Sequence, residues 1–328
     1  MNKLLIKNIS NKVVEEKRYK KIKKIAHEIK IIKIQWATKI AKEAFKVMAN
    51  EIQKQNFVDK SEFFEFFDKW TEILINARST EPMLFNGMKY AKFILKHNED
   101  KKLEVLKDKV TNAFNYFLEL VKHWDKYVYT HWSKIIKDNM KIMTHCHASS
   151  VVKLLKSAVW WKWREFEVFN TETRPLFQWR KTSKNLLYEW IKTTMVTDSS
   201  APYFVDNTVE KDIPIDVVII GCDAIKPNWD VVNKVWSFSI AMSAYYSKIP
   251  VYIVWNLLKT DYDNTAVIER RDWHELRKWA PKKLNFINLA FDTVPAKFIT
   301  WIITEFWIIK PKDVKKFAEK NYSRLIKN

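Results

Sequence analysis

Glycine is nearly absent from this sequence, which holds 2 glycines among 328 residues. Average usage of about 7% would give roughly 23 in a chain of this length. Dinucleotide- and phosphate-binding loops bring several glycines together because the backbone must approach the ligand closely. As written, the sequence contains no such loop. Any turn that needs a positive φ must therefore use a residue with a side chain.

Cysteine is scarce, and long apolar runs and an export signal are missing. The two cysteines, Cys146 and Cys222, cannot form a disulfide framework. No apolar run approaches the roughly 18 residues that a membrane-spanning helix needs. Residues 1–21 are charged and lack the apolar stretch and small-residue cleavage site of a secretory signal. We therefore expect no membrane association and a reducing, cytoplasmic location.

Tryptophan, in contrast, is abundant, with 16 residues. The glycine and tryptophan counts together come close to an ordinary glycine content. In "TRPLFQWRKTSKNLLYEW", Trp179 and Trp190 stand where the rhythm of strand, loop, helix and strand favours glycine. The codon UGA means tryptophan in some bacterial codes and glycine in a few others. Many of these tryptophans are thus, by hypothesis, glycine codons translated with the wrong table.

The net charge of +20 arises mostly from lysine. One interpretation is a nucleic-acid or phosphate-rich partner. The other is lysine enrichment on solvated helical faces, which the even spacing of lysines in "KRYKKIKKIAHEIKIIKIQW" favours. The stretch "VWWKWREFEVF" could stack single-stranded bases, but with glycine at its tryptophans it becomes an ordinary helix-to-strand loop. We do not predict a nucleic-acid partner, whereas a phosphorylated small substrate is compatible with either interpretation.

The hydrophobic pattern predicts an α/β fold in two domains. Residues 1–138 have helical periodicity, with Asp59 as a candidate N-cap. From about Lys141, β-type runs ("KIMTH", "FEVFNTE", "TTMVTD", "DVVIIG", "PVYIVW", "NFINLAFD") alternate with helical stretches that include "PAKFITWIITEF". Such alternation predicts βαβ units. We predict an N-terminal helical domain at 1–138 and a Rossmann-like domain with a mainly parallel sheet at 139–328.

In such a sheet, ligands bind at the carboxyl ends of the strands. "THCHASS", "TETRPLFQW", "TDSSAPY", "GCDAI" and "WNLLKTD" would then share one edge, where we expect the site. His145 and His147 flank Cys146, but the other histidines lack zinc-ligand spacing, so no metal is predicted. Cys146 is either a reactive thiol before a helix N-terminus or a small buried apolar residue. Asp223 is either catalytic or a helix cap.

The motifs around this edge resemble a known superfamily. It comprises ribose-1,5-bisphosphate isomerases, methylthioribose-1-phosphate isomerases and regulatory subunits of initiation factor 2B. The family patterns T-R-P-x-x-Q-G and N-x-x-x-N-K-x-G correspond to "TRPLFQW" and "NWDVVNKVW", and the R-G-A or Q-G-A segment corresponds to "IQWAT". The resemblance extends from about Ile34 to Pro311. Six tryptophans fall where the family places glycine: Trp36, Trp179, Trp190, Trp229, Trp236 and Trp307.

The resemblance implies an intramolecular aldose–ketose isomerase without a cofactor. "THCH" and "TETRP" are most similar to the archaeal type that converts ribose 1,5-bisphosphate to ribulose 1,5-bisphosphate in AMP salvage, ahead of Rubisco. It implies Cys146 and Asp223 as the catalytic pair, which the regulatory subunits typically lack. The implied substrate-binding residues are Gln35, Trp36, Ala37, Thr38, Arg78, Ala148, Ser149, Ser150, Arg174, Gln178, Asn233, Lys234 and Lys259.

Two alternatives and two departures accompany this resemblance. The alternatives are a methylthioribose-1-phosphate isomerase and a non-catalytic subunit like those of initiation factor 2B. Gln35 replaces an arginine found in some isomerases, which weakens one phosphate contact, and Cys222 stands where alanine is usual. The expected partners are a sugar bisphosphate substrate, AMP as a candidate activator, and further copies of the chain in a dimer-based oligomer, with a hexamer as one form.

Overall fold

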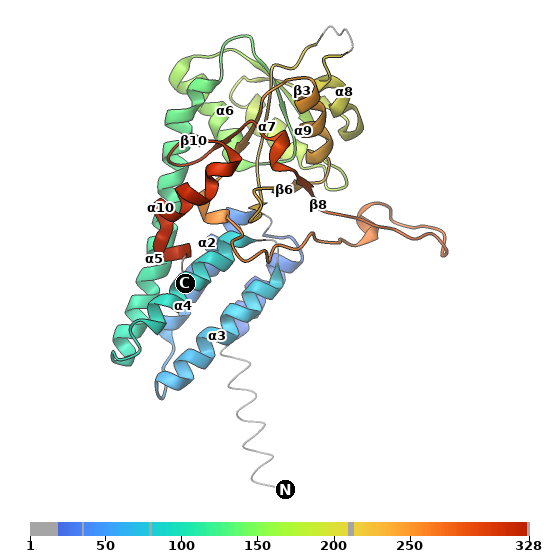
Figure 1. Ribbon diagram of the computed structural model, residues 1–328. Helices are drawn as coiled ribbons and strands as arrows, with labels where there is room; N and C mark the ends of the chain where they lie inside the picture. Colours follow the sequence, from blue (N-terminus) through green and yellow to red (C-terminus); the bar gives the residue numbers. More distant parts are fainter. Residues whose placement is uncertain (1–18, 35, 79–80, 209–212, 327–328) are drawn as a thin grey trace. The chain divides into compact units, whose positions relative to one another are not determined.

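The computed structural model describes residues 19–34, 36–78, 81–208 and 213–326 (Figure 1). The chain divides into two compact units, one of residues 1–121 with 324–328 and one of Lys122–Ser323. The division falls inside helix α5 (Leu103–Trp132), whereas the predicted domain boundary at residue 138 follows that helix. Among the described helices, none has the length and apolar character needed to cross a membrane.

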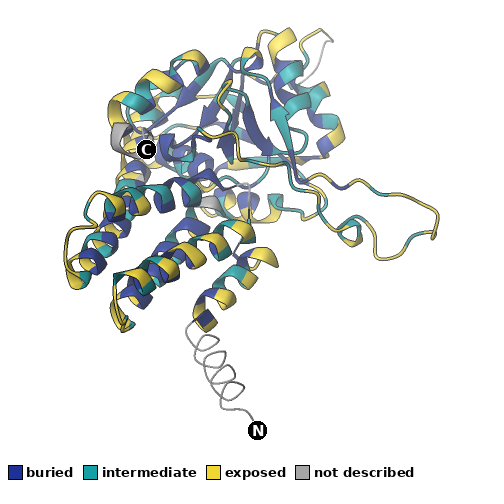
Figure 2. Ribbon diagram, turned by 60° about the horizontal axis from the view of Figure 1, so that its bottom comes forward, coloured by how far each residue is buried: buried dark blue, intermediate teal, exposed yellow. Residues whose placement is uncertain are grey.

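The first unit is helical, as its periodicity predicts. Residues 19–30 are helical and are followed by α2 (Ala37–Lys54), α3 (Lys60–Ala77), α4 (Pro82–Lys96) and the first part of α5. The Asp59 side chain accepts the Glu62 backbone N–H at 2.9 Å, which confirms the predicted N-cap. The core is rich in buried aromatic residues, namely Phe45, Phe63, Phe66, Phe67, Trp70, Phe114 and Phe117 (Figure 2).

The second unit is built on a seven-stranded sheet in the order β10-β9-β7-β4-β1-β2-β3. Neighbouring strands of this sheet pair in parallel, except that β9 and β10 are antiparallel. The strands are β1 (Lys141–Thr144), β2 (Glu167–Thr171), β3 (Lys192–Val196), β4 (Val217–Ile220), β7 (Val251–Val254), β9 (Trp301–Ile303) and β10 (Ile308–Ile309). A mainly parallel sheet of the Rossmann-like kind is thereby confirmed.

Helices cover both faces of this sheet, and a small second sheet extends from it. The order of connections reverses between β1 and β4, so that α6 (Ser149–Lys162) and α9 (Ser237–Tyr246) lie on opposite sides (Figure 1). Helix α7 (Trp179–Leu187) packs against β2 and β3. The second sheet is antiparallel, in the order β5-β6-β8, with β5 (Ala224–Ile225), β6 (Val231–Lys234) and β8 (Phe291–Val294).

One stretch predicted among the helices, whose apolar run "FITWIITEFWII" was also compatible with a pair of strands, forms the strands β9 and β10. The segment "PAKFITWIITEF" forms a short 3-10 turn (Ala296–Phe298) and then β9, which pairs in parallel with β7 through Ile253 and Ile302. Short apolar runs fit a buried strand as well as a buried helix. Ile302 and Ile303 are fully buried in the structure. The β-branched Ile302 and Ile303, and the edge of β7 that is available for pairing, favour the strand over the helix.

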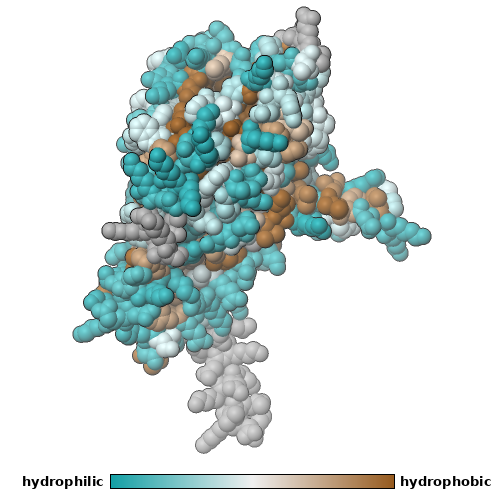
Figure 3. All heavy atoms as spheres, viewed as in Figure 1, coloured by the Kyte–Doolittle hydropathy of each residue, from teal (hydrophilic) through white to brown (hydrophobic). Residues whose placement is uncertain are grey.

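Residues 262–290 form an arm that extends away from the sheet of its own unit (Figure 1). Its base is fixed by the buried Asp261, whose carboxylate accepts the backbone N–H groups of Thr265 and Ala266. Several large apolar side chains along it are exposed, and Figure 3 shows brown, hydrophobic areas on the arm. The exposed side chains are Val267, Trp279, Leu284, Ile287 and Leu289.

Candidate active site

Cys146 and Asp223 follow neighbouring strands at the point where the strand order reverses. β1 and β4 pair in parallel, with Ile142 opposite Val217, so their carboxyl ends lie together. Cys146 comes two residues after β1, and Asp223 comes three residues after β4. The Asp223 carboxylate is close enough for its negative charge to raise the pKa of the Cys146 thiol. The structure thus brings the two predicted catalytic residues together.

The Cys146 thiol is held in its protonated form. Burial raises its pKa to about 12, the positive charge of Lys234 lowers it, and the negative charges of Asp223 and Asp198 raise it. The sulfur donates to the Gln178 Oε1 at 2.9 Å, and the Cys146 backbone N–H donates to the Thr173 Oγ1 at 3.2 Å. The sequence suggested a thiol tuned by a helix N-terminus and cations, but in the free protein burial has the larger effect.

Helix α6 begins three residues after this cysteine. Ala148 is its N-cap and makes no side-chain capping bond, and Ser149 and Ser150 are the first helical residues. Gly221 lies against this turn, because a Cβ at Gly221 would come within 2.4 Å of the Ala148 Cβ. The helix N-terminus and the β4 loop are therefore in contact. Backbone N–H groups at such an N-terminus suit an anionic group of a ligand.

Lys259 lies on the other side of the Asp223 loop. It ends the short 3-10 helix η3 (Leu257–Lys259), which follows β7, and its Nζ donates to the Cys222 carbonyl oxygen at 2.9 Å. Cys222 is buried, and its thiol donates to the Ala224 carbonyl oxygen. The Lys259 ammonium is thus bound to the backbone of the residue that precedes Asp223, at the same edge of the sheet.

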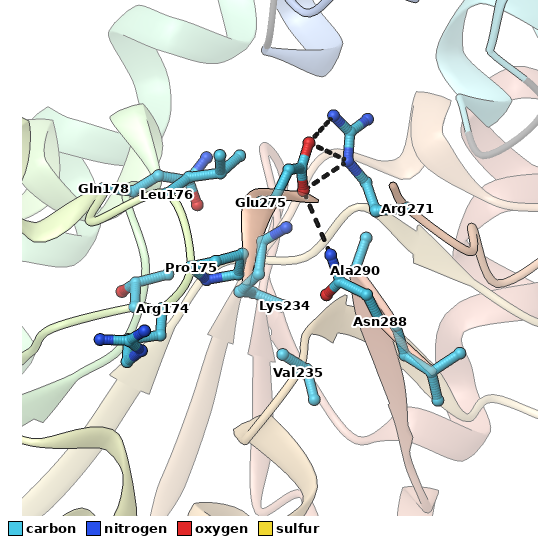
Figure 4. Close-up of a pocket in the computed structure, with 12 residues that line it drawn as sticks. Arg174, Pro175, Leu176, Gln178, Lys234, Val235, Arg271, Glu275, Asn288 and Ala290 are labelled. Atoms are coloured by element: carbon cyan, nitrogen blue, oxygen red, sulfur yellow. Dashed lines mark hydrogen bonds and ion pairs between the residues drawn. The ribbon is translucent and has the colours of Figure 1, made fainter. Parts of the chain in front are cut away.

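A small hollow opens beside Gln178 (Figure 4). Three predicted site residues line it, namely Arg174, Gln178 and Lys234. The opposite wall comes from the base of the arm, where Glu275 accepts from the Arg271 guanidinium and from the Asn288 side chain (Figure 4). Arg271, Glu275 and Asn288 were not predicted as site residues. Asn288 lies in "NFINLAFD", which was expected to be a strand but becomes one only from Phe291.

Asn233 and Lys234 end strand β6 near the same hollow. The Asn233 Nδ2 donates to the Ser237 Oγ at 2.8 Å, which ties the strand end to the start of α9. The Lys234 ammonium lies 4.4 Å from the centroid of the Phe291 ring. Its charge also acts on Cys146, so Lys234 is electrostatically coupled to the thiol.

The remaining predicted residues belong to the first unit. Trp36 is the N-cap of α2, and Ala37 and Thr38 begin that helix. Arg78 ends α3 as its C-cap and forms an ion pair with the buried Glu81, with the Nε 3.4 Å from a carboxylate oxygen. Gln35 lies outside the described residues.

Histidines beside the cysteine are engaged in hydrogen bonds. His147 contacts the Thr182 hydroxyl at 2.9 Å, and burial lowers its pKa to about 4. His145 is fully buried and contacts Thr171 and the Val235 carbonyl. In the part of the chain that the structure describes, no group of three or more histidine, cysteine, aspartate or glutamate side chains is arranged to hold a metal.

Comparison with known proteins identifies the family of the chain. Residues 33–311 match the model of the initiation factor 2 subunit family. The chain is 31% identical over 313 residues to a ribose 1,5-bisphosphate isomerase of Methanocaldococcus jannaschii, covering 93% of this chain and 97% of that protein. It is 29% identical over 274 residues to a methylthioribose-1-phosphate isomerase of a Thermoanaerobacter species, covering 77% of each.

Solved structures show the same fold. The crystal structure of 5-methylthioribose 1-phosphate isomerase from Pyrococcus horikoshii superimposes with a TM-score of 0.73 at 23% identity, covering 92% of this chain and 88% of that one. The translation initiation factor eIF-2B from Pyrococcus horikoshii gives a TM-score of 0.74 at 21% identity, covering 90% of this chain and 98% of that one.

Proposed function

Because this chain belongs to the initiation factor 2 subunit family, we propose that it is a sugar-phosphate isomerase that converts ribose 1,5-bisphosphate to ribulose 1,5-bisphosphate. The observation that carries the proposal is that Cys146 and Asp223 follow two neighbouring parallel strands at the point where the strand order reverses, with the Asp223 charge acting on the thiol. A thiol and a carboxylate at one site can exchange protons with a sugar from two positions. The names of the relatives supply the substrate class.

The reaction moves hydrogen atoms within one molecule and needs no oxidant. The furanose ring opens, the ring oxygen gains a proton, the C2 hydroxyl loses one, and the hydrogen on C2 moves to C1. We assign the donation to the ring oxygen, and the later return of a proton, to Asp223. Cys146 acts at C2 or at its hydroxyl as the neutral thiol that burial favours, by donating a hydrogen bond, and the carboxylate that Asp223 becomes after the first step accepts the proton of the C2 hydroxyl. Gln178 orients that thiol by accepting its proton in a hydrogen bond.

Two phosphate groups need two cationic or N–H-rich places. We assign the first phosphate site to the N-terminus of α6 together with Lys259. Helix α6 follows Cys146, and Lys259 binds the backbone beside Asp223. Lys234 and Arg174, which line the hollow of Figure 4, are the second site in this unit. The full proposed substrate-binding set is Gln35, Trp36, Ala37, Thr38, Arg78, Ala148, Ser149, Ser150, Arg174, Gln178, Asn233, Lys234 and Lys259.

A turnover assay tests the proposal. The purified full chain is given ribose 1,5-bisphosphate and, separately, methylthioribose 1-phosphate, and the ketose product is followed. We expect the bisphosphate to be turned over, and Cys146→Ser and Asp223→Asn each to abolish turnover. Asp216→Asn is the matched control, because that carboxylate accepts the Lys141 N–H at the opposite end of β1. Turnover of only the monophosphate supports the second isomerase. Absence of turnover on both supports a non-catalytic subunit.

The metabolic setting and assembly are part of the same proposal. AMP phosphorolysis would supply the substrate and Rubisco would consume the product in the cytoplasm, with AMP as a candidate activator. A homo-oligomer built from dimers, up to a hexamer, is supported by the exposed apolar residues of the arm, such as Ile287. Light scattering with and without AMP tests both the assembly and its response to the nucleotide.

A further inference from the structure

A buried hydrogen-bond network lies directly beneath the proposed site. His145 is 1% exposed, Thr171 is fully buried and Asp198 is 3% exposed. The His145 Nε2 lies 2.8 Å from the Val235 carbonyl oxygen, and its Nδ1 lies 2.5 Å from the Thr171 hydroxyl. Because a carbonyl oxygen only accepts, Nε2 must carry the proton, and Nδ1 then accepts from Thr171. The tautomer of His145 is thus fixed by its surroundings.

Asp198 fixes the loop on the opposite side of the cysteine. One carboxylate oxygen accepts the Thr173 backbone N–H at 2.8 Å, and the other accepts the Arg174 backbone N–H at 2.7 Å. The Thr173 hydroxyl in turn accepts the Cys146 backbone N–H. The same carboxylate lies 3.8 Å from the His145 ring. The network therefore reaches the backbone on both sides of the thiol.

We propose that His145 and Asp198 are positioning residues that hold the Lys234 loop and the Gln178 loop in register with Cys146. His145 links the end of β1 to Val235, the residue after Lys234. Asp198 links β3 to the loop that carries Arg174 and Gln178. Neither side chain lines the hollow, so each acts through the backbone of other residues. Only the expected effect of these residues on turnover rests on the proposed isomerase activity.

The test compares His145→Leu, His145→Gln and Asp198→Asn, with Asp216→Asn as the matched control. In the first and third variants we expect kcat to fall by about 10- to 100-fold with a smaller change in KM. Glutamine keeps an N–H donor for Val235 and should restore part of kcat. The rate at which iodoacetamide alkylates Cys146 should also change, because Gln178 no longer meets the thiol.

The alkylation rate makes the two proposals separable. A wild-type chain without turnover contradicts the isomerase, yet altered alkylation in His145→Leu and Asp198→Asn still supports the network. A wild-type chain with turnover, together with variants that keep both its kcat and its alkylation rate, overturns the positioning role. Circular dichroism at the assay temperature establishes that the compared variants are folded.

A second, independent observation concerns the backbone of tryptophan. In the described residues, eleven non-glycine positions have positive φ, and four of them are tryptophan: Trp163, Trp190, Trp229 and Trp236. A bulky residue with positive φ is a marked exception. The two glycines, Gly87 and Gly221, have no positive φ. Close packing explains these two instead, since an added Cβ would clash with Phe45 and Ala148 respectively.

Each of these four tryptophans occupies a structural position that favours glycine. Trp190 follows α7, where the Ile191 N–H reaches the Leu186 carbonyl and the Trp190 N–H reaches that of Leu187, a Schellman ending. Trp163 is the left-handed cap of α6. Trp229 closes the short hairpin between β5 and β6. Trp236 precedes α9 with φ 87° and ψ −12°.

Side-chain exposure alone does not separate these four positions from the other tryptophans, because Trp160, Trp161, Trp279 and Trp307 are exposed as well. Trp190 is 95% exposed and Trp163 is 86% exposed, whereas Trp70 and Trp255 are fully buried. Three of the four, Trp190, Trp229 and Trp236, are also among the six that the sequence placed at family glycines. Trp36 has φ −94° and Trp179 is the first residue of α7, so the backbone does not require glycine at those two positions.

The backbone geometry points to glycine at positions 163, 190, 229 and 236 of the protein as its own cell makes it, through a codon that is read there as glycine. Peptide masses from the protein isolated from that cell should show glycine at all four positions, and tryptophan there would overturn the inference. A recombinant chain with the four replacements should unfold at a higher urea concentration than the chain as written, and an equal or lower midpoint also contradicts it. Trp70→Gly, at a buried helical position, should be destabilising.

Discussion

At the scale of single residues, the candidate site is marked by backbone conformations that are costly to maintain. Cys146 has φ 66° and Thr173 has φ 56°, and the two are joined by a hydrogen bond. Left-handed conformations of residues with a Cβ cost on the order of 1–3 kcal/mol each and persist where the surroundings hold them. Here the Asp198 carboxylate and the Thr171 carbonyl bind Thr173 directly. The left-handed backbone conformation of Cys146 places its thiol within hydrogen-bonding distance of Gln178.

Gly221 provides a residue-scale prediction. A Cβ at this position would lie 2.4 Å from the Ala148 Cβ, so Gly221→Ala must displace the β4 loop from the start of α6. We expect a loss of about 1–3 kcal/mol in the free energy of unfolding and a lower kcat, because Asp223 lies two residues further on. Urea unfolding and the turnover assay measure the two effects.

The matched variant removes the opposing atom. Ala148→Gly combined with Gly221→Ala eliminates the Cβ that is struck, and glycine is acceptable at an N-cap. The double variant should regain most of the stability and turnover. If Gly221→Ala alone behaves like the parent chain, the close approach of the two segments does not limit the site.

At the scale of elements, alternation in the sequence was sufficient to predict the parallel strands that place the site. The runs containing β1, β2, β3, β4 and β7 are short, β-branched and separated by helices, so their order fixes which ends share an edge. β9 was mistaken for a helix because an apolar run of this length has no decisive periodicity. Its assignment depends on pairing with β7, which is not local information.

The same distinction applies to the site residues. Cys146, Asp223 and Gln178 follow predicted strands, whereas Lys234 ends β6, a strand that the hydrophobic pattern did not indicate, and was named from the family resemblance alone. Arg271 and Glu275 come from the base of an arm whose course no hydrophobic pattern describes. His145 and Asp198 stand in quoted motifs, but their connections to Val235 and Thr173 are visible only in three dimensions.

Glu305 carries an element-scale prediction that depends on pH. It is 3% exposed, and it joins helix α10 (Val314–Ile326) to the turn after β7 by accepting from the Tyr322 hydroxyl and the Leu257 N–H. Burial raises its pKa to about 7. Because the folded pKa is raised, the contribution to stability is fully present below the unfolded pKa of about 4.3 and is lost as the pH rises through about 7.

Glu305→Gln imitates the protonated carboxyl and does not titrate. The free energy of unfolding of the variant minus that of the parent should be about 1–3 kcal/mol larger at pH 8 than at pH 5. Urea unfolding of both chains at the two pH values measures this change. A difference between variant and parent that is the same at pH 5 and pH 8 would show that Glu305 is already charged in the folded state at pH 5.

At the scale of the whole molecule, the net charge of +20 exceeds what the individual contacts of the site require. Lysine and arginine number 58 against 38 acidic residues, and exposed lysines such as Lys23, Lys30 and Lys46 contribute to this excess. A field of one sign raises the local concentration of an oppositely charged ligand and its association rate. For a bisphosphate substrate, the excess positive charge would raise the association rate rather than stabilise the bound complex.

Salt should therefore reduce capture of the substrate while leaving the chemical step unchanged. The Debye length falls from about 30 Å at 0.01 M salt to about 8 Å at 0.15 M, so kcat/KM for ribose 1,5-bisphosphate should drop by about 10-fold across that range, and kcat should hold. Potassium chloride titration of initial rates measures both constants, with sucrose at equal viscosity as the control for diffusion. If kcat/KM stays constant in salt, the lysine excess plays no part in recruiting the substrate. If kcat falls in parallel, the salt is instead weakening contacts made in the bound state, such as those of Lys234 or Lys259.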